Sequence, residues 1–318
     1  MLKIHKNQSL AGFTTFKTGG PADYFARVRD VEELLEAVNI SKKMKIPFLV
    51  IGGGSNVLVG DHGFRGMVIK NEMNKISLMG AKGSYGKKNR FDQKVYLKVD
   101  SGVFMNRLVR YSLDNSYQGL ENFLGQPGTV GGAIYINAHN MKKDDFFGDH
   151  IKEAEIIEKN GERALIDKKY FRFTYDNSKI QKNGDIIVSI VVELKKKSGK
   201  EMKNIWKLAS EAVNTRQESQ PYGFPSAGCV FKNISKLDAL RIGTPNNTTS
   251  AGYLIDSCKL KDKRISDALI SPKHANFIIN LGSAKSADVL KLINLVKKKV
   301  WQKYKVHLEE EIVKLGEF

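Results

Sequence analysis

Apolar residues recur at helical spacing from Val31 to Lys45, after acidic residues that suit a helix N-terminus, and this pattern predicts an amphipathic helix. Beyond Pro47, the apolar run Phe48–Ile51 predicts a short buried strand. This strand leads directly into a glycine-rich stretch, and a further strand is predicted at Met67–Ile69. The chain therefore opens with a glycine loop placed at the end of a buried strand.

The middle of the chain is predicted to be rich in strands. Lys75–Leu78 and Val95–Val99 have the pattern of paired strands, and the Gly- and Lys-rich segment Gly80–Gln93 between them predicts an exposed, mobile turn. A helix is predicted at Phe104–Asn115, before a second glycine-rich passage, Gly125–Ala133. Further strands are predicted at Ile151–Glu158, Glu162–Ile166 and Ile186–Leu194.

The last third mixes both kinds of element. Helical periodicity covers Lys203–Gln217, where a domain boundary is expected, and Ala287–Tyr304, where Leu290, Ile293, Val296 and Val300 form an apolar stripe. Strands are expected at Ala275–Asn280 and Ile312–Leu315. Helices and strands mix without an internal repeat, which predicts an α+β fold.

Composition narrows the class of protein. The chain has 318 residues, 41% of them hydrophobic, and no apolar run approaches the roughly 18–20 residues that a membrane span needs. Residues 1–10 lack the apolar stretch of a signal peptide. Cys229 and Cys258 are too few for a disulfide framework, and no metal-binding spacing of Cys or His occurs. We expect a soluble cytoplasmic protein without a metal site or membrane insertion.

The net charge of +18 has three interpretations. The lysines are spread through nearly every segment, which favours a solvated basic surface. A positive field also attracts anionic small molecules such as dinucleotides and UDP-sugars. A nucleic-acid partner is disfavoured, because no recognised nucleic-acid-binding motif is present.

Both glycine loops suit a diphosphate, because glycine leaves backbone N–H groups accessible. Gly52–Asn56 lacks the Lys-Ser/Thr ending of a P-loop, and Val57 stands where a Rossmann pattern needs its last glycine. Two such loops could embrace one dinucleotide, but each could also be only a tight turn.

Six stretches in matching order carry a resemblance to a known family. They are Thr14–Ala22, Gly52–Val59, Gly119–Glu121 leading into Pro127–Ile134, Ser226–Asn233 with Leu254–Asp256, His274–Asn280, and Leu308–Ile312. With these motifs the chain resembles the UDP-N-acetylenolpyruvoylglucosamine reductases over nearly its whole length.

The resemblance implies an FAD-binding domain of the vanillyl-alcohol-oxidase type, made of two α+β subdomains at 1–72 and 73–202. It also implies a C-terminal α+β substrate domain at 203–318 whose final strand returns to the flavin site. The strand at Ile186–Leu194 runs directly into the next helix, which matches the shorter second type of the family.

The family's reaction would make this chain an FAD-dependent UDP-N-acetylmuramate dehydrogenase of peptidoglycan precursor synthesis. NADPH reduces FAD, hydride then goes to the β-carbon of the enolpyruvyl ether on the UDP-sugar, and a proton is added at the α-carbon. This chemistry needs a stabiliser for the enolate and a proton donor.

Site residues follow from the resemblance, position by position. Cys229 takes the place of the family's serine proton donor, and Glu311 matches its catalytic glutamate. From residue type alone, a core thiol is the more common role for Cys229, and a solvated carboxylate is the more common role for Glu311. Cys258 is expected in the core, and Glu309 and Glu310 are expected to be solvated. FAD contacts are implied for Gly52, Gly53, Gly54, Ser55, Asn56, Gly125, Gly128, Thr129, Gly131, Gly132 and Ala133. Substrate contacts are implied for Tyr175, Lys232, Asn233 and His274.

Two positions depart from the family pattern. Asp176 stands where the family has an arginine, and Ile265–Ala268 replaces a Gly-Gly pair. An anion beside a substrate carboxylate should weaken binding or slow the reaction, unless Arg172 or Lys179 compensates. Asp176 therefore keeps an FAD- or nucleotide-sugar-binding protein with impaired catalysis as an alternative. A flavin oxidase that uses O₂ is a further alternative, which the absence of a His- or Cys-based flavin-attachment signal near the loops disfavours.

Overall fold

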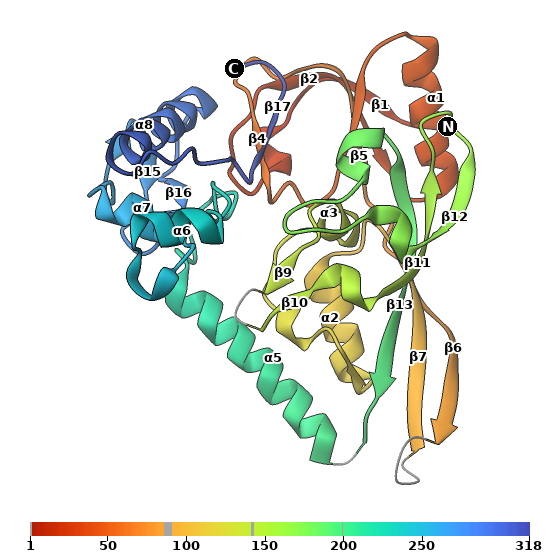
Figure 1. The fold of residues 1–318 in the computed structure, drawn as a ribbon. Coiled ribbons are helices and arrows are strands. Elements are labelled where there is room, and N and C mark those ends of the chain that lie inside the picture. Colours follow the sequence, from red (N-terminus) through yellow and green to blue (C-terminus); the bar gives the residue numbers. More distant parts are fainter. Residues whose placement is uncertain (1, 86–90, 141–142, 199) are drawn as a thin grey trace. The chain divides into compact units, whose positions relative to one another are not determined.

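The computed structural model describes residues 2–85, 91–140, 143–198 and 200–318, and the chain divides into two compact units (Figure 1). Unit 1 comprises the stretch up to Ile4, Ala26–Gly53 and Val68–Arg216. Unit 2 comprises His5–Phe25, Gly54–Met67 and Gln217–Phe318. The three-part division at residues 72 and 202 stays a prediction. Helices and strands mix in both units, as expected for an α+β fold.

The main sheet of unit 1 is antiparallel, in the order β12-β11-β13-β7-β6, with β8 paired to β13. Its central strand β13 (Ile186–Lys196) buries Ile187–Val192 without a break, because both of its faces are covered. The other strands are β6 (Ile76–Tyr85), β7 (Phe91–Asp100), β8 (Tyr117–Gln118), β11 (Ile151–Ile157) and β12 (Arg163–Asp167).

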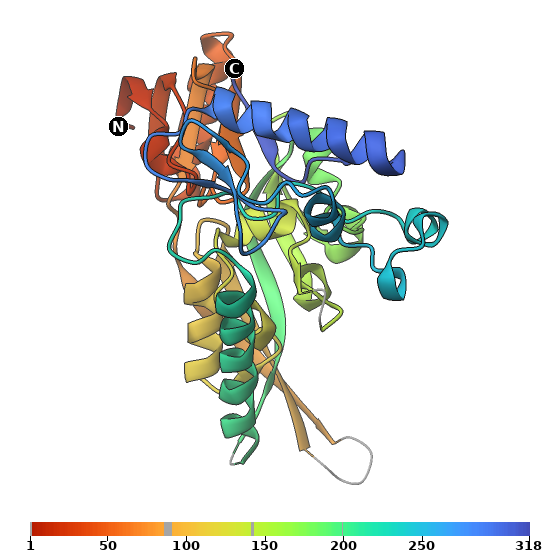
Figure 2. The same cartoon turned by 90° about the vertical axis from the view of Figure 1, so that its left-hand side faces the viewer.

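Two amphipathic helices complete the core of this sheet. α2 (Met105–Asp114) and α5 (Lys200–Ser219) lie side by side (Figure 2), and their apolar faces join one buried cluster with the strands. The Arg110 guanidinium lies 5.3 Å from the centre of the Trp206 ring between these helices. The remaining helices of unit 1 are α1 (Val31–Lys43), α3 (Val130–Tyr135) and α4 (Ile180–Asn183).

Smaller sheets accompany these elements. Strands β1 (Ile4–Ser9), β2 (Pro21–Val28), β5 (Phe64–Asn71) and β3 (Phe48–Ile51) form a sheet in that order, and β9 (His139–Asn140) pairs with β10 (Asp145–Phe146). Short 3-10 helices lie at Ala11–Phe13, Glu121–Phe123, Phe147–His150, Lys168–Phe171 and Pro245–Asn247.

Unit 2 is built around α8 (Ser286–Tyr304), which packs on the sheet β14-β15-β16 and on α7 (Ala251–Ser257) in a second buried cluster. The C-terminal strand β17 (Val313–Leu315) pairs in parallel with β4 (Val57–Val59). The strands of the sheet are β14 (Arg264–Ile265), β15 (Ala268–Ile270) and β16 (Ile278–Asn280), and α6 covers Lys236–Ile242.

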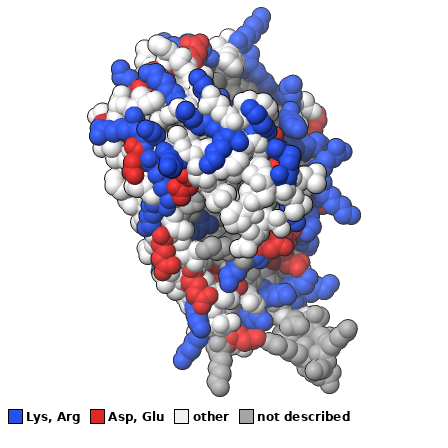
Figure 3. All heavy atoms as spheres, turned by 60° about the vertical axis from the view of Figure 1, so that its left-hand side comes forward, with Lys and Arg blue, Asp and Glu red and all other residues white. Residues whose placement is uncertain are grey.

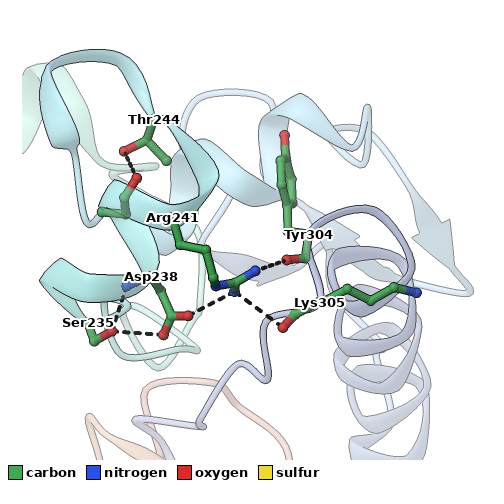
Figure 4. Close-up of polar contacts among 7 residues, drawn as sticks. Ser235, Asp238, Arg241, Thr244, Tyr304 and Lys305 are labelled. Carbon is green, nitrogen blue, oxygen red and sulfur yellow. Dashed lines mark hydrogen bonds and ion pairs between the residues drawn. The ribbon is translucent and has the colours of Figure 1, made fainter.

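Side chains from other segments hold both ends of α8. Asp61 accepts hydrogen bonds from the N–H groups of Ser286 and Ala287, both at 2.8 Å, where the helix's own N-cap, Lys285, offers no acceptor. At the other end, Arg241 donates to the carbonyls of Tyr304 and Lys305 at 3.3 and 3.4 Å (Figure 4). These bonds satisfy groups that a helix cannot pair internally.

The turn expected over Gly80–Gln93 is wrong in extent. Strands β6 and β7 remain paired from Ile76↔Val99 to Tyr85↔Phe91, and the part of this prediction at residues 86–90 lies outside the described residues. Backbone hydrogen bonds continue along this hairpin where Ala81–Gly83 are exposed, so no buried face marks the strands in the sequence.

Lysine and arginine side chains cover much of the face shown in Figure 3, with aspartate and glutamate between them. This distribution agrees with a solvated basic surface. Within the described ranges, no helix combines the length and apolarity needed to cross a bilayer.

Asp61→Ala should lower the free energy of unfolding by about 1–2 kcal/mol, because it removes a remote cap that also carries charge to a helix N-terminus. Urea unfolding followed by circular dichroism would measure this. Asp23→Ala is the control, since it removes a carboxylate in a surface pair with Arg65 that is worth little. Equal losses in the two variants would contradict the capping role.

Candidate active site

The two glycine loops touch within unit 1. A Cβ added to Gly53 would lie 2.8 Å from the Gly128 Cα, and one added to Gly52 would clash with the Thr129 side chain. Lys70 donates to the Gly52 carbonyl, and burial lowers the pKa of its ammonium. The loops therefore approach so closely that only glycine fits at positions 52 and 53.

Backbone donors in these loops fall into two groups. The N–H groups of Gly53, Gly128 and Thr129 have no acceptor among the described residues. In contrast, Gly125 donates to Asn106 Oδ1 and Gly131 to the Ser101 carbonyl, both at 2.7 Å. Gly132 and Ala133 lie in α3 and donate back to Thr129. Among the described loop residues of unit 1 considered above, the N–H groups that remain available to a ligand therefore lie where the loops meet.

The rest of the first loop lies in unit 2. Gly54 has a positive φ of 64°, and a Cβ there would clash with the Phe13 carbonyl. The Asn56 side chain donates to the Glu311 carbonyl at 3.1 Å, and the Asn56 carbonyl accepts from Val313 at 2.9 Å. Asn56, expected to contact FAD, thus holds the C-terminal segment.

Backbone pairing brings the two predicted catalytic segments together. The Glu311 N–H donates to the Val230 carbonyl at 2.8 Å, the Lys232 N–H donates to the Glu309 carbonyl at 2.9 Å, and Phe231 pairs with Glu310. Cys229, which is half-buried and forms no disulfide, precedes this pairing directly. Cys229 and Glu311 therefore lie on adjacent, antiparallel segments of unit 2.

Asn276 fixes the other edge of the Cys229 segment. Its carbonyl accepts from the Val230 N–H at 2.8 Å, and its buried side chain bonds both the N–H and the carbonyl of Phe231, at 3.0 and 2.8 Å. The sequence pattern does not single out Asn276, although this residue lies inside the His274–Asn280 motif.

His274 is held beside Asn276. Its Nδ1 accepts from the Asn276 N–H at 3.2 Å, and its ring meets Phe277 edge-on with centroids 4.9 Å apart. Burial lowers the pKa of the imidazole, so the ring is neutral near pH 7.

Two other expected substrate residues of unit 2, Lys232 and Asn233, come shortly after Cys229 in the chain. The Lys232 ammonium lies 3.8 Å from the Glu309 carboxylate. Asn233 Oδ1 accepts from the Ala251 N–H at 3.2 Å, at the start of α7.

The glutamates beside Glu311 differ from each other. Glu309 is exposed, as expected. The expectation that Glu310 is a solvated carboxylate is wrong: its side chain is 11% exposed and pairs with Lys297 and Lys314. Burial raises the pKa of Glu310, but hydrogen bonds from both lysines outweigh this and leave the pKa lowered.

Tyr175 and Asp176 lie in unit 1. The Asp176 carboxylate is buried and lies against His139, whose ring also contacts Tyr175. Arg172 is exposed, and the Lys179 ammonium lies 3.6 Å from the centre of the Tyr170 ring.

Cys258, which was expected in the core, is partly buried and packs against the hydrophobic core of unit 2. Burial raises the pKa of the Cys258 thiol.

Two family models match the chain. One describes an FAD-binding domain and covers residues 22–165, and the other describes the C-terminal domain of UDP-N-acetylenolpyruvoylglucosamine reductase and covers residues 220–315. The reductase of Caldicellulosiruptor bescii is 36% identical over 100% of this chain and 92% of its own length. The reductase of Chlamydia pneumoniae is 35% identical over 97% and 91%.

The chain belongs to the UDP-N-acetylenolpyruvoylglucosamine reductase family. The crystal structure of the reductase from Thermus caldophilus matches with a TM-score of 0.76 and 30% identity, covering 99% of both chains. The predicted family and its FAD-binding fold are thereby confirmed.

In His274→Gln, the melting temperature should fall less than in the parent as the pH is lowered below 6.5. The folded protein favours the neutral ring, while the unfolded ring takes up a proton near pH 6.5. This contribution is therefore complete above pH 6.5 and is lost as pH falls toward the lower pKa of the folded state. Melting temperatures at pH 7.5, 6.5 and 5.5 would show a smaller decline in His274→Gln than in the parent. His62→Gln, at an exposed ring, is the control; an unchanged decline in His274→Gln would contradict the assignment.

Proposed function

We propose that this chain reduces the enolpyruvyl ether of UDP-N-acetylglucosamine enolpyruvate to UDP-N-acetylmuramate, with FAD and NADPH, in peptidoglycan precursor synthesis. The observation that carries the proposal is the pairing of the Cys229 and Glu311 segments in a chain of this family. When bound, FAD accepts hydride from NADPH and supplies it to the substrate double bond.

The glycine loops hold the cofactor in this proposal. Gly53, Gly128 and Thr129 offer N–H groups where the loops meet, and such groups suit a diphosphate. Gly52 and Gly53 keep side chains out of this region, and the Lys70 charge lies beside them. Four residues of the second loop have N–H groups that already donate to protein acceptors: Gly125, Gly131, Gly132 and Ala133. We propose that these residues contribute to the site by setting the conformation of the loop. Family membership also favours contacts with FAD for the rest of the first loop, which consists of Gly54, Ser55 and Asn56.

Cys229 is the proposed proton donor to the α-carbon. A thiol, with a reference pKa near 8.5, gives up a proton more readily than a hydroxyl. Its place next to Val230 is fixed on both sides, by Asn276 and by Glu311. Glu311 is the proposed catalytic carboxylate that acts with it, because the backbone pairing leaves it little freedom to move.

Tyr175, Lys232, Asn233 and His274 are the proposed substrate residues. Lys232 supplies a positive charge, and neutral His274 can exchange hydrogen bonds without adding charge. Because Asn233 Oδ1 already accepts from Ala251, its amide N–H group is the part that remains for a ligand. We also propose a cytoplasmic location, in agreement with two cysteines that form no disulfide.

Asp176 favours one alternative: an FAD- or nucleotide-sugar-binding protein with impaired catalysis. An absorbance spectrum separates the functions. Flavin bands that NADPH bleaches without oxygen, and that the enolpyruvyl UDP-sugar restores, support the reductase. Bleaching without restoration by the substrate would favour the binding protein.

Gly53→Val should purify folded but colourless, because its side chain would push against the Gly128 backbone and cover the open N–H groups. Flavin absorbance relative to protein, with circular dichroism for folding, would measure this. Gly80→Ala is the control, since nothing lies within 4 Å of the added Cβ. Retention of a full complement of flavin in Gly53→Val would refute the assignment of this loop.

Cys229→Ala should be reduced by NADPH at a near-normal rate but turn over substrate about 10²–10⁴-fold more slowly, the range of general acid catalysis. Cys229→Ser should keep substantial activity, since a hydroxyl can also donate a proton. Rapid-mixing absorbance would follow the two half-reactions separately. A thiol-alkylating reagent should inactivate the parent, and bound substrate should protect it. Turnover of Cys229→Ala at the parent rate would return Cys229 to the role of a core thiol.

A further inference from the structure

Asp176 is a buried carboxylate whose charge is poorly compensated. Its side chain is 2% exposed, and neither of its oxygens accepts a hydrogen bond from a described residue. Burying such a carboxylate is costly unless a cation faces it. The chain therefore places a demanding anion at the position where the family pattern has an arginine.

His139, on β9, faces this carboxylate. Its Nδ1 lies 3.2 Å from Asp176 Oδ1, as an ion pair that is not aligned as a hydrogen bond. Asp176 has no other ion pair among the residues that the structure describes. The His139 imidazole is therefore the polar group that the buried carboxylate faces.

The His139 ring is also held by aromatic neighbours. Its centroid lies 5.0 Å from that of Tyr175 and 5.6 Å from that of Phe146. Its side chain is 16% exposed, and its Nε2 has no partner within the described ranges. An imidazole that packs on aromatic rings beside a carboxylate, with one ring nitrogen available, can donate a hydrogen bond to a ligand.

We propose that His139, placed beside Asp176 and Tyr175, binds the enolpyruvyl carboxylate of the substrate through a hydrogen bond from its Nε2. This inference rests on the proposed function, in which Tyr175 beside His139 contacts substrate. The pair takes over the task of the family's arginine: Asp176 occupies its place in the sequence, and His139 provides the hydrogen-bond donor.

The geometry favours His139 over the two cations nearest in sequence. Arg172 is exposed after a 3-10 helix, and Lys179 is engaged with the Tyr170 ring. His139, in contrast, contacts both Tyr175 and Asp176.

The test compares two ligands that differ in the carboxylate. His139→Gln should weaken the binding of UDP-N-acetylmuramate by about 10- to 100-fold, the range for a hydrogen bond to a charged group. UDP-N-acetylglucosamine lacks the carboxylate, and its affinity should not change. Titration calorimetry on the FAD-loaded protein would measure both. A parent-like affinity of His139→Gln for both ligands, or equal losses for both, would overturn the proposal.

A second variant separates binding from stability. His139→Gln leaves the buried Asp176 carboxylate without its imidazole neighbour and should lower the melting temperature, whereas His139→Gln with Asp176→Asn also removes the carboxylate charge and should recover it. The carboxylate preference should stay lost in the double variant. Its recovery together with stability would mean that His139 is only structural.

His150 provides the matched control. It also pairs with an aspartate, Nε2 to Asp145 Oδ1 at 2.7 Å, with a side chain that is 19% exposed, but it packs on Phe123. His150→Gln should keep the carboxylate preference. Loss of the preference in Arg172→Ala or Lys179→Ala, with His139→Gln normal, would assign the role elsewhere.

The reductase assignment and the role of His139 can be tested separately. If the substrate does not reoxidise the reduced flavin of the parent, the reductase assignment is wrong whatever the variants do. If the parent turns over and His139→Gln keeps the carboxylate preference, only the role of His139 is wrong.

Discussion

The hydrogen bond from the Glu311 N–H to the Val230 carbonyl is the constraint on which the proposed catalytic segments of unit 2 depend. It joins two segments that are far apart in sequence and that no regular sheet contains. Asn276 secures one of them and Asn56 the other, each with a side-chain amide. Amides suit this task because one group can both donate and accept without adding a charge beside the proposed site.

Glycine acts in the loops through close approach as much as through conformational freedom. Composition alone indicated accessible N–H groups, but the structure shows that most N–H groups of the second loop already have partners. What distinguishes the site is the contact of Gly53 with Gly128. A contact between two loops cannot be read from either loop alone.

The sequence predicted best the elements that a regular pattern of apolar residues marks. α1, α2, α5 and α8 follow their apolar stripes closely, and the buried run at Ile186–Leu194 is the central strand β13. Hairpin β6–β7 was underestimated because its outer part has no buried face to mark it. The Cys229–Glu311 assignment came from motifs, because neither residue type is diagnostic by itself.

Pairings between distant polar residues were the part that the sequence could not supply. The contact of His139 with Asp176 and the lysine partners of Glu310 depend on where the backbone brings the side chains. No periodicity records such pairs. The departure at Asp176 was visible in the sequence, but its partner was not.

Helix α8 closes with bonds that its own residues do not provide. Asp61 precedes it by most of the chain, and Arg241 comes from α6 (Figure 4). Ordinary helices fray from their ends, and their terminal amides exchange hydrogen with solvent through small local openings. In α8, opening either end also breaks bonds to Asp61 or Arg241. The amide hydrogens of its terminal turns should therefore exchange with solvent at the slow rate of the unit 2 core, and not at the faster rate of a free helix end.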